Sequence, residues 1–515
     1  MNFSGSQRRG GPSIWFAGSA LVPAALISLP LVYVALRATQ AGVVGIHTEL
    51  FRSRTLMLLI NTLVITVSVT ILSSLIGLAV AWCVERTDLP GRRVWRILAG
   101  VPLAVPAFVS SYAWSSISPM FQGMAGAILV LSLASYPLVY LPVAAGLRGV
   151  DPGFEDVARS LGDGPWRCFL RAVLPQLRPA LGGGALLVLT HMLAEFGAFS
   201  MLRVQTFTTA IFESYQLQFD SSSAALQSIV LMALCLPAAY GEMRLRAGTR
   251  VARVGRGSAR AASTVRLGRL RHGALAGFVA LVVLALGVPL ATLAYWLAVG
   301  HSAGRGYAEI LPAIGGTVAL ASTGAVVTSL FAVPLVLLSL RHRGWLAQLA
   351  DRLPYIIHGL PGVVVALAMV FMSIHLVPAL YQGVAVLLLA YAILYLPLAQ
   401  SSLRASAELV SPQLEIVARG LGRRPLAAFL TATLPNIAPG IGAALALMVL
   451  EIARELTATL MLAPTGVTTL ATQVWSHTYD AEYAAAAPFA ALLVLISIVP
   501  VYFFTQRFLQ FGESK

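Results

Sequence analysis

Ionisable side chains lie inside two strongly apolar stretches of this 515-residue chain, at matching places. His191 and Glu195 form one pair, and Glu451 and Glu455 form the other, with Arg454 beside Glu455. The spacing of four residues predicts that the two side chains of each pair share one face of a helix. A charge within a membrane span costs about 2.5–3.5 kcal/mol on insertion scales, so such residues are functional hypotheses. Carboxylates suit hard cations, which makes a lined pathway one interpretation. A polar lock between helices is the other, and the residues identify no particular metal.

The composition around these charges predicts an all-α membrane protein. Hydrophobic residues make up 58% of the chain, charged residues only 11%, and the mean hydropathy is +0.82. A soluble domain carries about 25% charged residues, and a membrane-spanning helix needs about 20 apolar residues. We expect about twelve transmembrane helices, in the windows 14–36, 56–84, 97–118, 124–147, 181–203, 222–243, 273–299, 310–340, 353–375, 380–401, 439–462 and 484–504.

The net charge of +15 reports topology rather than a nucleic-acid partner. With the N-terminus inside, most of the 35 basic residues fall on cytoplasmic segments, which is the positive-inside bias. Both termini are then cytoplasmic, and the main surroundings are the lipid bilayer. The aromatic residues that a nucleic-acid groove interleaves with basic ones are missing from these loops.

An internal repeat divides the chain into two halves. Residues 155–180 and 415–440 are identical at thirteen of 26 positions, at a constant offset of 260. Both segments follow the fourth apolar window of their half, so the repeat is parallel, with a pathway expected between the halves. We predict a first six-helix repeat at 1–243, a basic cytoplasmic linker with nine arginines at 244–272, and a second six-helix repeat at 273–515.

The repeated segment has a readable local structure. Asp151-Pro152 and Ser411-Pro412 predict helix starts, with short helices over about 153–161 and 413–421. Gly162 and Gly422 then supply left-handed helix ends. Each helix is expected to carry an apolar face, formed by Val157, Ala158 and Leu161 and by Val417, Ala418 and Leu421. Such a face suits a groove on a partner, and two copies suit a symmetric dimer.

This segment resembles the EAA loop of ABC-importer permeases, in which a small-residue triplet precedes a glycine and then a Leu-Pro pair. The triplet positions are Asp156-Val157-Ala158 and Ile416-Val417-Ala418. Neither copy has the family's glutamate at the first of these, because Glu155 and Glu415 lie one position earlier. The resemblance covers nearly the whole chain. Residues 195–215 and 454–476 look like the iron(III)-type permeases, although fused thiamine and 2-aminoethylphosphonate permeases share the pattern.

The resemblance implies a transport subunit of the bacterial cytoplasmic (inner) membrane, importing iron(III) or one of those two alternatives. It implies no catalytic residues and no cofactor in this chain. A separate homodimeric ATPase would bind ATP and Mg²⁺, and an extracytoplasmic binding protein would deliver the substrate. The residues expected to couple to the ATPase lie in two coupling loops, 148–180 and 402–438: Glu155, Asp156, Val157, Ala158, Gly162, Leu174, Pro175, Glu415, Ile416, Val417, Ala418, Gly422, Leu434 and Pro435.

The motifs missing from the sequence also favour ATP hydrolysis by a separate subunit. A P-loop needs a lysine beside its glycine-rich turn, and the only lysine is Lys515. The sequence has no HExxH zinc motif and no GxSxG nucleophile motif. An ion-coupled secondary transporter with its own repeat is the alternative from another class. The external segments 204–221 and 463–483, with Phe207, Tyr215, Trp475 and Tyr479, are expected to form either a docking face for the binding protein or an aromatic interface belt.

Overall fold

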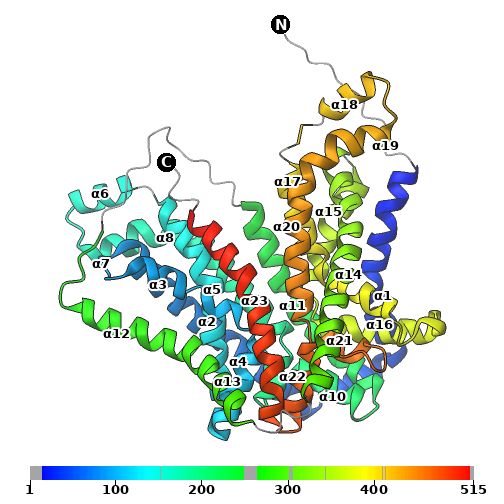
Figure 1. Ribbon diagram of the computed structural model, residues 1–515, viewed down its shortest axis with the longest axis horizontal. Helices are drawn as coiled ribbons and strands as arrows, with labels where there is room; N and C mark the ends of the chain where they lie inside the picture. The colour runs from blue at the N-terminus through cyan, green and yellow to red at the C-terminus, as the bar shows by residue number, and fades with distance from the viewer. Residues whose placement is uncertain are drawn as a thin grey trace. The chain divides into compact units, whose positions relative to one another are not determined.

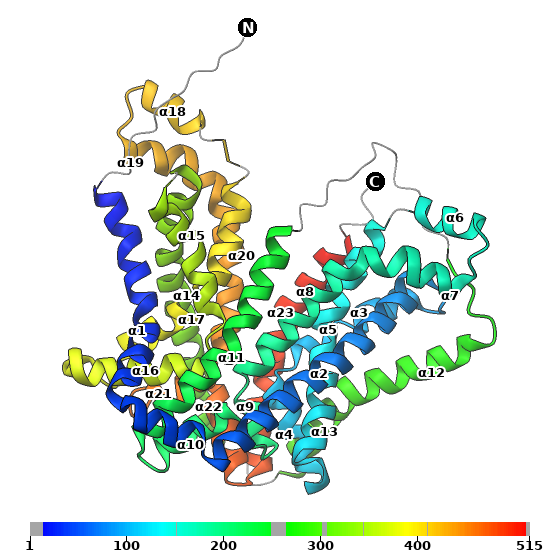
Figure 2. The ribbon, with the colours of Figure 1, turned by 180° about the vertical axis from the view of Figure 1, so that it is seen from behind.

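The computed structural model describes residues 14–150, 152–248, 264–300, 306–342, 344–408, 410–411 and 413–510. Within these ranges the chain is helical, and its only β-type pairing is an isolated bridge between Thr87 and Val265 (Figures 1 and 2). The all-α class is therefore confirmed. Asp151, Pro412, residues 249–263 of the predicted linker and Lys515 lie outside the described residues.

Eight helices of the described chain are long and apolar enough to cross a membrane. They are Ser53–Arg86, Met124–Gly149, Trp166–Ala194, Ser221–Gly241, Leu270–Val299, Ala308–Arg341, Val384–Ala407 and Leu426–Ala453. Three further windows hold shorter apolar helices, Gly18–Tyr33, Gly362–Leu376 and Tyr483–Ile498. The remaining window holds a helix pair, Arg92–Ala104 and Ala107–Ile117, bent by 88°.

Two matched prolines interrupt spans that the sequence treats as continuous. Pro106 precedes helix α4 (Ala107–Ile117), and Pro361 precedes helix α16 (Gly362–Leu376). Proline has no N–H to donate and clashes with the preceding helical turn, so each proline begins a new helix instead of extending the old one. The windows 97–118 and 353–375 therefore each contain a break.

The helices gather into two compact units. One combines the chain up to Gln40 with Ile314–Thr468, and the other combines Ala41–Ala313 with the chain from Thr469 onward. Helix α1 (Ile14–Leu50) leaves the first unit at a kink, where Gly42 has a φ of 63°. The compact units thus differ from the sequence halves, and the repeat boundaries at 1–243 and 273–515 remain a prediction.

Three helices form the centre of the unit that begins at Ala41: α2 (Ser53–Arg86), α5 (Met124–Gly149) and α8 (Leu174–Ala194). A Cβ atom on Gly77 of α2 would lie 2.8 Å from the Cβ of Val139, and one on Gly184 of α8 would lie 2.8 Å from its Cα. Glycine is therefore required where both helices approach α5, a close packing that membrane helices use in place of hydrophobic collapse.

The other unit contains α17 (Val384–Ala407), α20 (Leu434–Ala453) and most of α14 (Gly306–Arg341), whose Gly324 lies close to Tyr391 of α17 and Ile452 of α20. Helix α17 packs along α20, and α15 (Trp345–His358) and α16 pack on α17. Apart from the short helices of the two coupling loops, the remaining α-helices are α3 (Arg92–Leu98), α9 (Gly197–Met201), α10 (Phe207–Gln216), α11 (Ser221–Gly248), α12 (Leu270–Val282), α13 (Val288–Val299), α21 (Thr457–Leu462), α22 (Leu470–Tyr479) and α23 (Tyr483–Gln510). Helices α11 and α12 take up both ends of the predicted linker.

Candidate functional site

The two coupling loops fold into the same succession of elements. In the first loop α6 (Pro152–Ser160) is followed by α7 (Pro165–Cys168), a π-helical turn (Phe169–Val173) and α8. In the second loop α18 (Gln413–Gly420) is followed by α19 (Pro425–Ala428), a π-helical turn (Phe429–Thr433) and α20. The short helices predicted at 153–161 and 413–421 are confirmed. Figure 1 shows each pair of short helices at the end of its own unit.

Both short helices end in a Schellman motif. Gly162 has a φ of 86° and Gly422 a φ of 84°. Beyond them, the N–H of Asp163 donates to the carbonyl of Ala158 at 3.0 Å, and the N–H of Arg423 donates to that of Ala418 at 3.2 Å. The left-handed ends predicted from the two glycines are confirmed. A Cβ atom at either glycine would meet open space, so their requirement is conformational and not steric.

The Leu-Pro pairs stand at the start of α8 and α20, immediately after the π-helical turns. Pro175 and Pro435 cannot donate a backbone hydrogen bond, and their rings crowd the carbonyl four residues earlier. The wider π turn accommodates this defect without ending the helix. The chain is helical from Trp166 to Ala194 and from Leu426 to Ala453. The fifth helices therefore begin before the windows that start at 181 and 439.

A buried ion pair fastens the first coupling helix to a membrane helix. Glu155 is only 4% exposed, and its Oε1 lies 2.9 Å from Nη1 of Arg86, the last residue of α2. Arg86 is itself 2% exposed. Arg159 approaches the other carboxylate oxygen at 3.5 Å from the exposed side. Glu155 therefore serves as an anchor on the side of α6 that faces its own protein.

The second coupling helix repeats this anchor. Oε2 of Glu415 lies 2.7 Å from Nη2 of Arg341, the last residue of α14, and Oε1 lies 2.7 Å from Arg419. The hydroxyl of Thr433 donates to the same carboxylate at 3.2 Å. Sequence reasoning missed Arg86 and Arg341. The signal was present, because they are 255 positions apart, the same offset that relates Pro106 to Pro361.

The outward faces of the two short helices are apolar. Leu161 is 80% exposed and Leu421 79% exposed, and the equivalent valines, Val157 and Val417, are exposed as well. Asp156 and Ile416, at the first triplet position, also point outward. The prediction that Ala158 shares the outward face is wrong, because Ala158 lies one helical turn from Glu155 and is buried beside it. Ala418 is half-buried.

Glu195 and Glu455 lie beyond the helices in which the sequence placed them. Helix α8 ends at Ala194 and α20 at Ala453, so neither glutamate belongs to the helix predicted to carry it, although Glu195 remains next to His191 as its spacing predicts. Each carboxylate instead accepts from the first turn of the next short helix. Oε1 of Glu195 accepts from the N–H of Ala198 at 2.8 Å, and Oε1 of Glu455 accepts from that of Ala458 at 3.0 Å.

The other charges near these positions have local partners. Nε2 of His191 lies 3.6 Å from Oε2 of Glu195, with the imidazole half exposed. Arg454 forms an ion pair with Glu451, three residues earlier in the chain. The hydroxyl of Thr459 also donates to Glu455, at 2.9 Å. Within the described ranges, no group of three or more His, Cys, Asp or Glu residues is arranged to hold a metal ion.

Comparison with known proteins identifies the family. The description "Binding-protein-dependent transport system inner membrane component" matches residues 43–240. The Fe(3+)-transport system permease protein FbpB 2 of Haemophilus influenzae is 42% identical over 495 residues, covering 95% of this chain and 98% of that protein. The chain belongs to the binding-protein-dependent ABC permeases.

Other relatives of the permease carry different cargo names. The sulfate transport system permease protein CysT of Escherichia coli K12 is 30% identical over 35% of this chain and 73% of its own length. The molybdenum transport system permease protein ModB of the same organism is 29% identical over 31% of this chain and 80% of its own length. The permease is therefore a multi-pass membrane component of a binding-protein-dependent transport system.

The aromatic residues of the two external segments divide between core and surface. Phe207 is fully buried, so it packs in the permease core and is excluded as a docking residue. Trp475 is half-buried, with its indole N–H donating to the hydroxyl of Ser200 at 3.2 Å, and Tyr479 stacks on it and is exposed. The choice between a docking face and an interface belt therefore concerns Tyr479, Trp475 and the half-buried Tyr215.

Replacing Glu195 and Glu455 together by glutamine should impair transport while leaving assembly intact. The glutamine oxygen can still accept from the N–H groups of Ala198 and Ala458, so the replacement removes the charge and, at Glu455, the second oxygen that accepts from Thr459. Double alanine replacement removes the cap as well and should lower stability by about 0.5–2 kcal/mol per site. Substrate uptake into vesicles and the thermal midpoint of the purified permease separate the two effects. Glu408→Gln, which changes an exposed glutamate just after the end of α17, is the matched control. Normal uptake by the double glutamine variant would show that the carboxylates are caps only.

Proposed function

We propose that this permease is the membrane subunit of an ATP-driven, binding-protein-dependent importer of iron(III) in a bacterial inner membrane. The relative named as an Fe(3+)-transport permease supports this cargo, because the alignment covers nearly all of both chains. The relatives named for sulfate and molybdenum align with about a third of the chain. We therefore assign iron(III), the substrate named for the relative that aligns over nearly the whole chain, as the substrate of this permease.

We infer twelve membrane spans in two parallel repeats of six, with both termini in the cytoplasm. Eight long helices, one bent helix pair and three shorter apolar helices account for the twelve apolar windows. The repeated order of α6–α7–α8 and α18–α19–α20 supports the parallel repeat, since the equivalent elements are separated by the same offset of 260 residues. The shorter helices would cross with the help of the adjoining turns or by bilayer thinning.

The observation that carries the proposed mechanism is the outward apolar face of α6 and α18. Exposed leucines on a cytoplasmic surface require a partner, and helix-in-groove docking buries such a face. We infer that the partner is a homodimeric ATPase, whose two identical grooves match the two similar helices. ATP and Mg²⁺ would bind that subunit, and an extracytoplasmic binding protein would supply the substrate.

The buried ion pairs would pass the ATPase motion into the membrane. Glu155 connects α6 to the end of α2, and Glu415 connects α18 to the end of α14. Helices α6 and α18 are each joined by a four-residue turn to α7 and α19, which continue through the π turns into α8 and α20. A displacement of either short helix is therefore transmitted to two membrane helices, which is the physical basis for coupling between distinct sites.

Co-purification tests the proposal against the alternative of a secondary transporter. An ATPase subunit should remain bound to the intact permease through detergent extraction and affinity purification. ATP hydrolysis by the complex should then rise when a loaded binding protein is added. An isolated permease that transports its substrate fully without an ATPase would overturn the proposal.

A further inference from the structure

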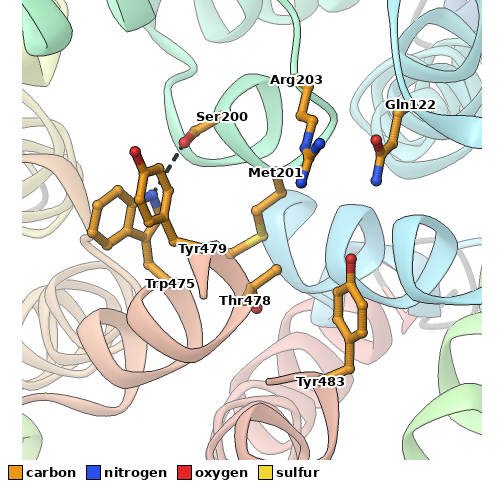
Figure 3. Close-up of a pocket in the computed structure, with 8 residues that line it drawn as sticks. All are labelled: Gln122, Ser200, Met201, Arg203, Trp475, Thr478, Tyr479 and Tyr483. Carbon is orange, nitrogen blue, oxygen red and sulfur yellow. Dashed lines mark hydrogen bonds between the residues drawn. The ribbon is translucent and has the colours of Figure 1, made fainter. Parts of the chain in front are cut away.

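A cavity of about 350 Å³ lies in the unit that begins at Ala41, away from the coupling loops. Its lining includes Gln122, which precedes α5, and Arg203, which follows α9 (Figure 3). Tyr479 and Tyr483 contribute from α22 and the start of α23. Helix α5 has 26 residues and runs from the cavity end to the first coupling loop. At 1.5 Å per residue this separates the two sites by about 40 Å, so they lie toward opposite membrane faces.

Several polar side chains that face this cavity can donate hydrogen bonds. Figure 3 shows the Arg203 guanidinium, the Gln122 amide and the Tyr483 hydroxyl converging on one space. The described residues that line the cavity include no aspartate or glutamate. Among the described residues, the guanidinium of Arg203 has no ion-pair partner. The side-chain hydroxyls of Tyr479 and Tyr483 have no hydrogen-bond partner there either. Arginine and its neighbouring donors are suited to the oxygens of a carboxylate, phosphate or sulfate group.

The backbone at Arg203 is held in an uncommon conformation. Its φ of 55° places a long side chain in the left-handed region, which favours glycine. The N–H of Arg203 donates to the carbonyl of Ser200 at 3.2 Å, which helps to fix that turn. In the second half, the position 260 residues later is Ala463, so the charge is present in one half only. The N–H of Val204 also donates to the carbonyl of Phe199 at 2.9 Å, so Arg203 occupies the left-handed position that ends α9, and its side chain lines the cavity.

The wall opposite these donors is aromatic. Trp475 and Tyr479 stack with their ring centroids 5.0 Å apart, and the Trp475 indole is fixed by its hydrogen bond to Ser200. An apolar wall with a few convergent polar groups is typical of small-molecule sites, and the volume fits a small ligand. We propose that this cavity binds a small organic or inorganic oxyanion, with Arg203 as its charged ligand and Gln122 and Tyr483 as further donors.

The proposal rests on the proposed function only for placing the cavity on the external side, and its test requires neither ATP nor transport. Equilibrium dialysis of the full-length permease in detergent, with radiolabelled phosphate and with radiolabelled citrate, measures binding directly. At least one probe should bind saturably, and Arg203→Gln should weaken it by about tenfold or more. Arg52→Gln, which removes an exposed arginine that pairs with Glu49 in the same unit, should leave binding within about twofold.

Two further variants guard against an indirect effect. Arg203→Gly relaxes the left-handed backbone and should fold at least as well as the parent, yet it should lose binding to the same extent. Tyr483→Phe should weaken binding while preserving the ring contacts of the residue. Absence of saturable binding in the parent, or equal binding by Arg203→Gln, would overturn the proposal. If no free oxyanion binds but Arg203→Gln weakens docking of the binding protein, the proposal is also overturned, in favour of contact with a protein carboxylate.

Discussion

Replacing Glu155 by leucine should destabilise the permease by about 3–5 kcal/mol, because the Arg86 guanidinium is then left buried without its partner. Arg86→Met should cost a similar amount through the orphaned carboxylate. The double variant should recover most of the loss, since a well-packed apolar pair of similar volume replaces a buried ion pair at little cost. The thermal midpoint of the full chain in detergent gives this comparison.

Arg159→Gln is the matched control for this double-variant cycle. Arg159 contacts the same carboxylate but is 42% exposed, so its removal should cost less than about 1 kcal/mol. The equivalent anchor in the second half should show a smaller effect, because Arg341 is 29% exposed whereas Arg86 is 2% exposed. Single variants of Glu155 or Arg86 with the parent's thermal midpoint would contradict the anchoring role.

Placing aspartate at both Leu161 and Leu421 should abolish ATPase coupling without unfolding the permease. Each side chain is about four-fifths exposed, so its replacement disturbs no packing within the chain. In a complex, however, each aspartate would be buried in an apolar groove and would carry an unpaired charge at a cost of several kcal/mol. Binding of the ATPase subunit should weaken by more than about a hundredfold.

The control for this pair is Leu270→Asp at the start of α12. Leu270 is 74% exposed and lies on the predicted cytoplasmic side, outside both coupling loops. It should leave ATPase binding unchanged. Co-purification yield and ATP hydrolysis rate measure the outcome, and the thermal midpoint shows that the variants fold. Undiminished coupling in the Leu161 and Leu421 double variant would exclude these helices as the docking elements.

The short helices of the coupling loops and their ends could be predicted from the sequence, because the residues that start and end a helix lie next to it in the chain. Gly162 and Gly422 follow their helices within two residues, and the Leu-Pro pairs begin the next ones. The anchors were not predicted because Arg86 and Glu155 are 69 positions apart, and no local pattern relates them. The only sequence signal for the arginines was the repeat offset of 255, which relates Arg86 to Arg341 as it relates Pro106 to Pro361.

The fifth helices show where composition misleads. Apolar residues continue past Ala194 and Ala453, so a hydropathy window extends the span through Glu195 and Glu455. The chain turns instead, because each carboxylate satisfies the N–H groups that open the next short helix. The grouping of α1 up to Gln40 with helices of the second half was also beyond sequence reasoning, since it depends on contacts more than 270 residues apart along the chain.

The ATP hydrolysis rate of the reconstituted complex tests the proposed importer most directly. The complex would contain the permease, its ATPase subunit and the cognate binding protein, loaded in turn with iron(III), thiamine, 2-aminoethylphosphonate or sulfate. Iron(III)-loaded binding protein should stimulate hydrolysis and drive iron into the vesicles, and the other loaded forms should leave the rate at its basal level. Stimulation by another ligand with no response to iron(III) would contradict the iron assignment, and iron uptake without ATP hydrolysis would contradict the importer mechanism.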